Sequence, residues 1–469
     1  MRSGEEAVLC RRNVQLMYIF KILNGVAYGI AMGPVFDKYI YYLGGGHIRG
    51  PQWAPQHAEN SLVGLVESVS GLASLGLAIP VGILVDSNPT KRARLLKLSI
   101  AFGVFGGVFT ILAVLTDVVI LLYFTLFLLG TFQELAYSAT EAIFADSIPS
   151  AERPALFTKK GMIELIAFGC GPLISAVGLQ CIGDEWQAYQ MKAVIVIGSI
   201  ILVVSCAPLY YFRDPPAVEQ NANSEPSMAG ETAATHGASP VPARRCGPFR
   251  PCHVPWFLAF VNFVTAVGAG MTVKFFNLFF IQDEHFSPVE INVLQTAYPF
   301  IIALFMKFTE LVAKPLGRAQ ASLLFFASNV LCLYMLSFIK SVPVLLVVFL
   351  LRGGFANSTN PIDRSILMDY TPSSQRGRWN AIETLTSVTW SGSAFLGGIL
   401  SDSHDYSFTF LITAMMYSAS CLVYTPLLGL VPRKQIESTV STTVESREVP
   451  LVSKNDASTV STSSTSIGA

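Results

Sequence analysis

Residues Asp146–Arg153 read DSIPSAER, and the same pattern returns 223 residues later as Asp369–Arg376, which reads DYTPSSQR. Asp, Pro, Ser and Arg occupy the same places in both copies, and the Glu of the first copy is matched by Gln in the second. The same spacing maps Gly169 onto Gly392. This register predicts that the chain consists of two duplicated halves.

The sequence around these repeats is too apolar for an ordinary soluble protein. Charged residues make up 13% of the 469 residues, against about 25% in soluble domains, and hydrophobic residues make up 52%. The formal net charge is zero, which argues against nucleic acid as a partner. Twelve apolar runs are long enough to cross a bilayer. They lie at 14–43, 60–85, 95–116, 118–141, 155–180, 190–212, 254–281, 287–312, 321–339, 343–363, 377–400 and 407–431.

We therefore expect an all-α membrane protein with twelve transmembrane helices in two duplicated six-helix halves. The halves are residues 1–212 and 253–432. Between them, residues 213–252 are rich in proline and contain no apolar run, which predicts a disordered linker. The Ser- and Thr-rich residues 433–469 predict a disordered tail.

The orientation in the lipid bilayer follows from the basic residues. Of 31 Lys and Arg residues, 24 fall on the side that holds both termini and the linker, whereas the opposite connections carry Arg49, Lys192 and Lys340. Because positive residues stay inside, we expect a multi-pass protein with both termini and the linker in the cytoplasm. The sequence does not distinguish the plasma membrane from an organelle membrane.

One further motif follows the second apolar run. Residues Gly82–Arg92 read GILVDSNPTKR, which places Gly82, Asp86, Lys91 and Arg92 in the pattern Gly-x-x-x-Asp followed by a basic pair. With this motif and its two halves, the chain resembles the major facilitator superfamily over essentially its whole helical part. The resemblance implies a secondary transporter with its solute path between the halves.

The resemblance also implies a cytoplasmic gate at the motif residues Gly82, Asp86, Lys91 and Arg92. The repeated loops place an acid before a base in the same way, as Asp146 with Arg153 and as Asp369 with Arg376, and we include them in the expected gate. The alternative is that these acids and bases neutralise one another and anchor helix ends at the interface.

Charged residues at membrane depth are expensive and usually functional. Arg352 lies about 14 Å into the tenth span, near the midplane, and Glu164 and Glu134 lie in the fifth and fourth spans. In the family the first, fourth, seventh and tenth spans line the path. The resemblance therefore implies a solute site with Lys21, Asn24, Gln133, Glu134, Asn262, Lys274, Arg352 and Asn357, with Asp363 as a further lining residue. Glu134 and Glu67 are candidates for proton coupling, and sodium coupling stays open.

Other features of the spans have structural explanations. Gly25, Gly29 and Gly33 recur at a spacing of four, which favours close helix approach or a hinge. We expect Asp37 and Lys38 to sit at the membrane interface. The phenylalanines of the seventh span are expected to face lipid; they are Phe275, Phe276, Phe279 and Phe280.

The leading function is transport of a small polar organic solute by alternating access, with or without proton coupling, by a protein that functions as a monomer. The basic residues favour an anionic solute, whereas the acidic residues oppose that preference. No catalytic residues, cofactor or metal centre are expected, because the six histidines lie in connections or at span edges. A transporter-like receptor or chaperone that moves no solute is the alternative.

Overall fold

A computed structural model describes residues 4–45, 59–87, 91–149, 152–215, 250–371 and 376–432. The expected linker and tail lie almost wholly outside these residues. In the described part the chain is helical and contains no strand. Eleven helices are long and apolar enough to cross a membrane. The eleventh expected span is also a helix, Arg376–Ser403, but its Ser, Thr and Gly residues keep it below that threshold of hydropathy.

The described residues of the first half, which we call the N-half, form eight helical segments. The first expected span is divided between α1 and α2, and the sixth between α7 and the short α8. The segments are α1 Gly4–Ala31, α2 Pro34–Gly44, α3 Glu59–Ser87, α4 Arg92–Thr116, α5 Val119–Ser147, α6 Arg153–Ile182, α7 Ala188–Ser205 and α8 Ala207–Tyr210.

The described residues of the second half, the C-half, also form eight α-helical segments. The tenth expected span is divided between α12 and α13, and the twelfth between α15 and the short α16. The segments are α9 Val254–Gln282, α10 Pro288–Leu316, α11 Arg318–Phe338, α12 Val342–Ser358, α13 Asn360–Tyr370, α14 Arg376–Ser403, α15 Tyr406–Tyr424 and α16 Leu427–Leu430.

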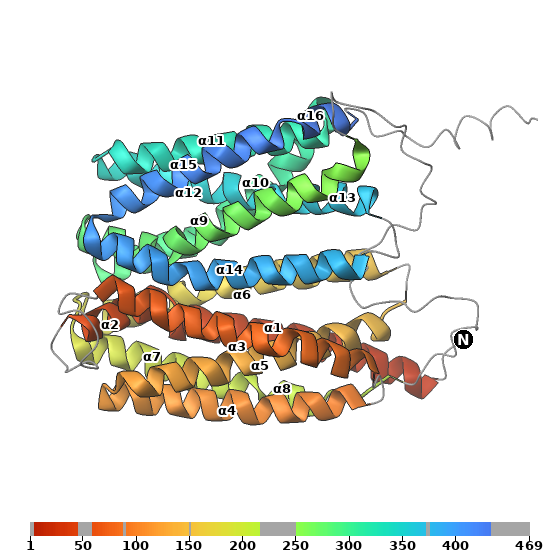
Figure 1. The fold of residues 1–469 in the computed structure, drawn as a ribbon. Coiled ribbons are helices and arrows are strands. Elements are labelled where there is room, and N and C mark those ends of the chain that lie inside the picture. Colours follow the sequence, from red (N-terminus) through yellow and green to blue (C-terminus); the bar gives the residue numbers. More distant parts are fainter. Residues whose placement is uncertain are drawn as a thin grey trace, which may run out of the picture. The chain divides into compact units, whose positions relative to one another are not determined.

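The two halves repeat the same packing pattern, which confirms the duplication (Figure 1). In the N-half α1 packs on α6 and α7, α5 packs on α3 and α4, and α4 packs on α7. The C-half repeats each of these pairings: α9 packs on α14 and α15, α12 on α10 and α11, and α11 on α15. An ion pair is duplicated as well, since Arg92 pairs with Asp146 and Arg318 pairs with Asp369.

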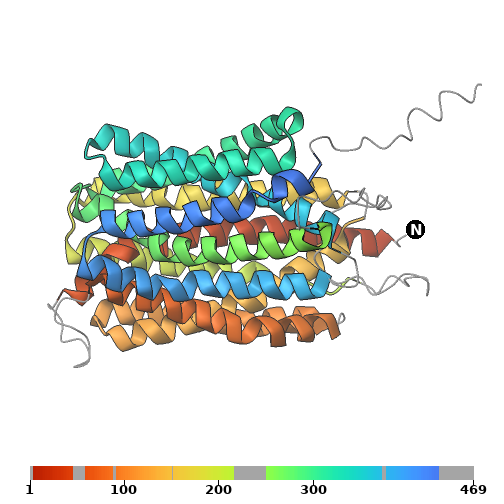
Figure 2. The ribbon, with the colours of Figure 1, turned by 45° about the horizontal axis from the view of Figure 1, so that its top comes forward.

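The main contacts between the halves are made by two helix pairs, α3 with α14 and α6 with α10; smaller contacts join α2 to α9 and α10, and α3 to α9. Figure 2 shows α14, in blue, running alongside the helices of the N-half. Glycine allows the approach of α3 to α14, because a Cβ on Gly64 would lie 2.2 Å from the carbonyl oxygen of Ala394. We call the end of the bundle where α1 begins the near end and the opposite end, where α2 ends and α3 begins, the far end.

The glycines of the first span mark a close packing and a break, as their spacing predicts. A Cβ on Gly29 would lie 2.7 Å from the carbonyl oxygen of Phe168 and 2.9 Å from the Cα of Gly171, so α1 and α6 touch backbone to backbone. Gly33 precedes the break, and α2 begins at Pro34, whose missing N–H suits the first position of a helix.

Two expectations about the spans were wrong. The four phenylalanines of α9 do not face lipid; all are at most 3% exposed, and Phe276 stacks on Phe410 at 4.6 Å between ring centres. Asp37 is not exposed at the end of its span as a residue of the interface would be, since its buried carboxylate accepts a 2.8 Å hydrogen bond from Asn277 of the other half. A sequence gives the depth of a residue in a span but not the direction in which its side chain points.

Candidate solute-binding site

A cavity of about 860 Å³ opens inside the C-half. Its lining follows α9 from Val273 to Ala259 and continues along α12 and α13 from Arg352 to Leu367, so it extends from mid-bundle toward the near end. Cavities of about 300–1,000 Å³ are typical of small-molecule sites. Three of the residues expected in the solute site line it, namely Asn262, Arg352 and Asn357.

Arg352 is the buried charge of this cavity. Its side chain is 3% exposed, and its guanidinium carbon lies 4.5 Å from the centre of the Phe276 ring. Nη1 donates a 3.3 Å hydrogen bond to the hydroxyl of Tyr298, whereas Nε has no hydrogen-bond partner among the described residues. The glycine that follows makes this arrangement possible, because a Cβ on Gly353 would lie 2.2 Å from the Tyr298 ring.

Asp363 lies in the same cavity, where two hydroxyl groups of the lining bind its carboxylate. Its Oδ1 accepts 2.7 Å hydrogen bonds from the hydroxyls of Ser322 and Tyr424. These bonds tie α13 to α11 and α15. Asp363 and Arg352 therefore line one cavity without forming an ion pair.

At the far end, carboxylates of one half cap helices of the other. Asp402 of α14 accepts hydrogen bonds from the backbone amides of Asn60 and Ser61 at 2.9 and 2.8 Å, and from the Ser61 hydroxyl at 2.5 Å. Asp184, after α6, accepts a 2.8 Å bond from the amide of Val289 in the first turn of α10. The amides of a first helical turn lack partners within the helix, so these carboxylates satisfy donors that α3 and α10 leave free.

A partly buried charge cluster accompanies these caps. Lys274 of α9 lies 3.2 Å from Glu67 of α3 and 3.8 Å from Asp37 of α2. Asn277 donates to Asp37 and accepts a hydrogen bond from Gln295 of α10. Lys274 and Glu67, expected respectively in the solute site and in proton coupling, thus link the two halves near the far end.

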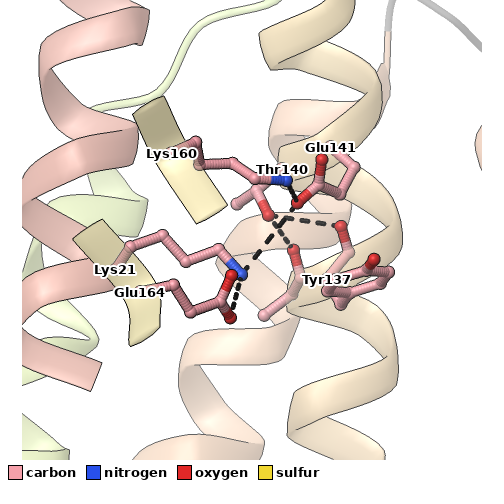
Figure 3. Close-up of polar contacts among 7 residues, drawn as sticks. Lys21, Tyr137, Thr140, Glu141, Lys160 and Glu164 are labelled. Carbon is pink, nitrogen blue, oxygen red and sulfur yellow. Dashed lines mark hydrogen bonds and ion pairs between the residues drawn. The ribbon is translucent and has the colours of Figure 1, made fainter. Parts of the chain in front are cut away.

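Lys21 belongs to a different cluster, inside the N-half (Figure 3). Its Nζ lies 2.8 Å from Glu164 of α6 and 4.0 Å from Glu141 of α5, which also pairs with Lys160. The cluster holds two lysines and two glutamates, so its formal charge is zero. Lys21 is 4% exposed, whereas 45% of the Glu164 side chain is exposed.

The remaining expected solute residues of the N-half are dispersed. The buried Oδ1 of Asn24 has no hydrogen-bond partner in the described part of the chain. Gln133 is exposed, and Glu134 accepts a 3.3 Å hydrogen bond from Ser138 one turn further along α5. Their roles in a solute path, like the proton coupling at Glu134 and Glu67, stay predictions.

The expected cytoplasmic gate is only partly described. Lys91 is exposed and precedes α4, and a Cβ on Gly82 would meet open space. Arg92 donates to the carbonyl of Val85 at 3.0 Å and pairs with Asp146, and Asp369 pairs with Arg318 at 2.6 Å. These described pairs lie within one half. The side chains of Asp86, Arg153 and Arg376 lie outside the described residues, so the gating role stays a prediction.

Sequence reasoning missed several residues that complete the cavity. They lie on the eighth, ninth, eleventh and twelfth spans, which the family pattern does not place on the path, and they include Tyr298, Asn329, Trp390 and Tyr417. The far-end carboxylates Asp184 and Asp402 were missed as well. Their position at the end of a helix is visible in the sequence, but the helix that each one caps is not.

The model of the Major Facilitator Superfamily matches residues 16–259 and 258–463, so the chain belongs to this family. The chain has the two-half fold of the transporters of this family. No curated protein sequence matches it.

Three solved structures illustrate the likeness of fold. A bacterial homologue of the human lysosomal transporter Spinster, in an inward-facing and occupied conformation, has a TM-score of 0.64 at 11% identity, over 93% of this chain and 100% of that one. A bacterial homologue of the iron transporter ferroportin, in the inward-facing state, has a TM-score of 0.63 at 10% identity, over 88% and 98%. The nucleoside transporter NupG has a TM-score of 0.62 at 15% identity, over 89% and 99%.

Proposed function

We propose that this protein moves a small polar organic solute across a membrane by alternating access of its two halves. Membership of a transporter family supports transport in general. The size and polar lining of the cavity around Arg352 support a small organic solute.

The observation that carries the proposal is the position of the contacts between the halves. The described hydrogen bonds and ion pairs that join them lie between the far end and Ser68 of α3, and most are around Asp402, Asp184 and Lys274. The cavity, in contrast, extends toward the near end. A seal at one end and a cavity toward the other is the arrangement expected of one state of a carrier whose halves rock around a central site.

The orientation follows the charge asymmetry of the sequence. Most Lys and Arg residues lie in connections at the near end, which we therefore place in the cytoplasm. On this orientation the structure corresponds to an inward-facing state.

Proton coupling is a finer part of the proposal. Glu67 is a better candidate for the coupling residue than Glu134, because Glu67 contacts Lys274 of the other half and must lose that contact when the far end opens. Glu134 instead has its described hydrogen bond within α5. A pH gradient across proteoliposomes that drives uptake in the wild type but not in Glu67→Gln would support this assignment.

The transport experiment can begin with the solute still unidentified. Proteoliposomes that contain the purified protein would be incubated with a metabolite extract, and the accumulated solutes would be identified by mass spectrometry. A cysteine pair at Ser61 and Asp402, whose side chains touch at 2.5 Å, provides the control in a background without other cysteines. We expect oxidation of the pair to lock the far end and stop uptake, and reduction to restore it.

Each single-cysteine variant controls for the oxidation itself. Uptake that continues in the oxidised pair would contradict alternating access. If no solute accumulates with the wild type under any condition, the transport proposal fails and a receptor or chaperone role becomes the better explanation.

A further inference from the structure

The cavity of the C-half holds a buried positive charge without an opposite charge beside it. Arg352 is 3% exposed, and no carboxylate of the described residues lies within ion-pair distance of it. Its guanidinium contacts a hydroxyl and an aromatic ring, those of Tyr298 and Phe276. These contacts orient the guanidinium but leave its charge uncompensated, which is costly for a buried ion.

The charges that line the cavity do not balance. Three charged residues contribute to the lining: Arg352, Arg364 and Asp363. Asp363 accepts hydrogen bonds from Ser322 and Tyr424, which also line the cavity, so its carboxylate is already held by two hydroxyls. Arg352 is therefore the charge of the lining that lacks a counter-ion among the described residues.

The N-half differs in this respect. The two lysines of the Lys21 cluster are matched by Glu141 and Glu164 within the cluster. An anion would therefore bind most favourably at Arg352, where it would compensate a charge that has no counter-ion among the described residues.

The cavity also contains polar atoms that no described side chain satisfies. Nε of Arg352 is a donor without a partner, and Oδ1 of the buried Asn329 is an acceptor without a partner. The hydroxyl of Thr265, which lines the same cavity, is likewise unpaired. Buried polar groups are normally hydrogen-bonded, so an unpaired donor and an unpaired acceptor in one cavity are typical of a site that a ligand completes.

We infer that the cavity binds an organic monoanion, with its carboxylate on Arg352 and a hydroxyl or amide hydrogen-bond donor toward Asn329. The planar guanidinium matches a carboxylate, which can accept two parallel N–H bonds from it. The aromatic side chains of Trp390, Tyr298 and Tyr417 in the lining suit a partly apolar body. This inference rests on the proposed transport function only in treating the bound molecule as the transported solute.

A matched set of probes tests the two parts of the inference. Mandelate carries a carboxylate, a hydroxyl and an aromatic ring; mandelamide removes the charge, and phenylacetate removes the hydroxyl. Lactate and lactamide form a smaller pair in case the ring does not fit. Binding to the purified wild-type protein would be followed by thermal stabilisation and titration calorimetry.

We expect mandelate or lactate to bind, its amide to bind at least about tenfold more weakly, and Arg352→Gln to remove the difference between acid and amide. Arg352→Lys should retain part of the preference, because it keeps the charge but not the planar fork. Asn329→Leu should reduce the preference for mandelate over phenylacetate while leaving the preference for acid over amide.

The comparison of acid with amide on the wild-type protein needs no variant, so it tests the preference for an anion even if Arg352→Gln does not fold. The inference is overturned if neither acid binds, if acids and amides bind equally, or if Arg352→Gln keeps the preference. Counterflow of the same probe in proteoliposomes separates the two proposals. Binding without flux overturns transport but not the anion site, whereas flux of a neutral or cationic solute that survives Arg352→Gln overturns the anion site alone.

Discussion

The carboxylate of Asp402, near the end of α14, accepts hydrogen bonds from both the backbone amide and the hydroxyl of Ser61, in the first turn of α3. The two residues belong to different halves, so this cap forms only while the far end is closed. A second carboxylate, Asp184, caps α10 from the end of α6. Since α3 corresponds to α10 and α14 to α6 in the duplicated pattern, the two caps are related by the repeat.

We predict that Asp402→Ala opens the far end. Loss of a capping side chain costs about 1 kcal/mol, which here weakens one conformation relative to the other and changes their ratio about fivefold. A cysteine introduced at the buried position Val63 should react faster with a membrane-impermeant maleimide in this variant. Asp405→Ala is the matched control, because Asp405 caps α15 within the C-half by accepting from Phe408. Equal labelling in the two variants would refute the gating role of Asp402.

We predict that Asp184→Ala acts in the same direction and adds to Asp402→Ala. The caps lie on separate helix pairs and share no residue, so their free-energy contributions should be additive within about 0.5 kcal/mol. The measurement is the same labelling rate in both single variants and the double variant. A double variant no more reactive than either single variant would show that one cap alone holds the seal.

We predict unequal effects within the Lys21 cluster. Glu164→Gln leaves the buried Lys21 with Glu141, 4.0 Å away, as its remaining charged partner, and should destabilise the protein by about 3 kcal/mol. Lys21→Met should cost less, because nearly half of the Glu164 side chain is exposed and Glu141 keeps its ion pair with Lys160. Adding Lys21→Met to Glu164→Gln should recover part of the loss of stability. Thermal unfolding in detergent measures the stability of the two single variants and the double variant. A double variant as unstable as the less stable single variant would contradict the ion pair between Lys21 and Glu164.

We predict that Gly29→Ala separates α1 from α6 and lowers the unfolding temperature. The added methyl group would meet the backbone of Phe168 and Gly171, which cannot rotate away as a side chain can. Gly178→Ala in α6 is the control, since its Cβ would meet nothing within 4 Å, and it should be neutral or stabilising because alanine favours a helix by about 0.5–1 kcal/mol. Equal unfolding temperatures for the two variants would argue against the close contact.

We predict that Asp283, in the connection after α9, makes stability depend on pH. Burial and, second, the charge of Asp405 raise the pKa of its carboxyl to about 6. The folded protein therefore binds this proton more tightly than the unfolded chain, and stability should fall as the pH rises from about 4 to about 6. Asp283→Asn should flatten that part of the pH profile of the unfolding temperature. An unchanged profile would show that another group titrates there.

Much of the fold could be predicted because duplication and hydropathy are properties of the sequence itself. The helix Arg376–Ser403 was also expected, although its polar residues keep it below the hydropathy of the other spans. The glycines before Pro34 left open whether a hinge or a close helix contact occurs there, because Gly and Pro are tolerated within membrane helices, as Pro80 and Pro172 show.

The site was harder to predict for a geometric reason. Arg352 was found because a charge at mid-depth is conspicuous, whereas the uncharged Tyr298 and Asn329 give no such signal. Lys274 was expected beside the solute, but its partners Asp37 and Glu67 come from helices more than 200 residues away. Only the packing of the halves reveals that it belongs to the far-end contacts.

The interruption of the first span between α1 and α2 has a mechanical consequence. The glycines of α1 hold it against α6, whereas α2 carries Asp37 across to α9. Pro34 cannot donate the backbone hydrogen bond that would stiffen the junction. The eleven residues of α2 can therefore tilt about this junction independently of α1. Such a tilt would separate Asp37 from the C-half before the two halves rotate relative to each other.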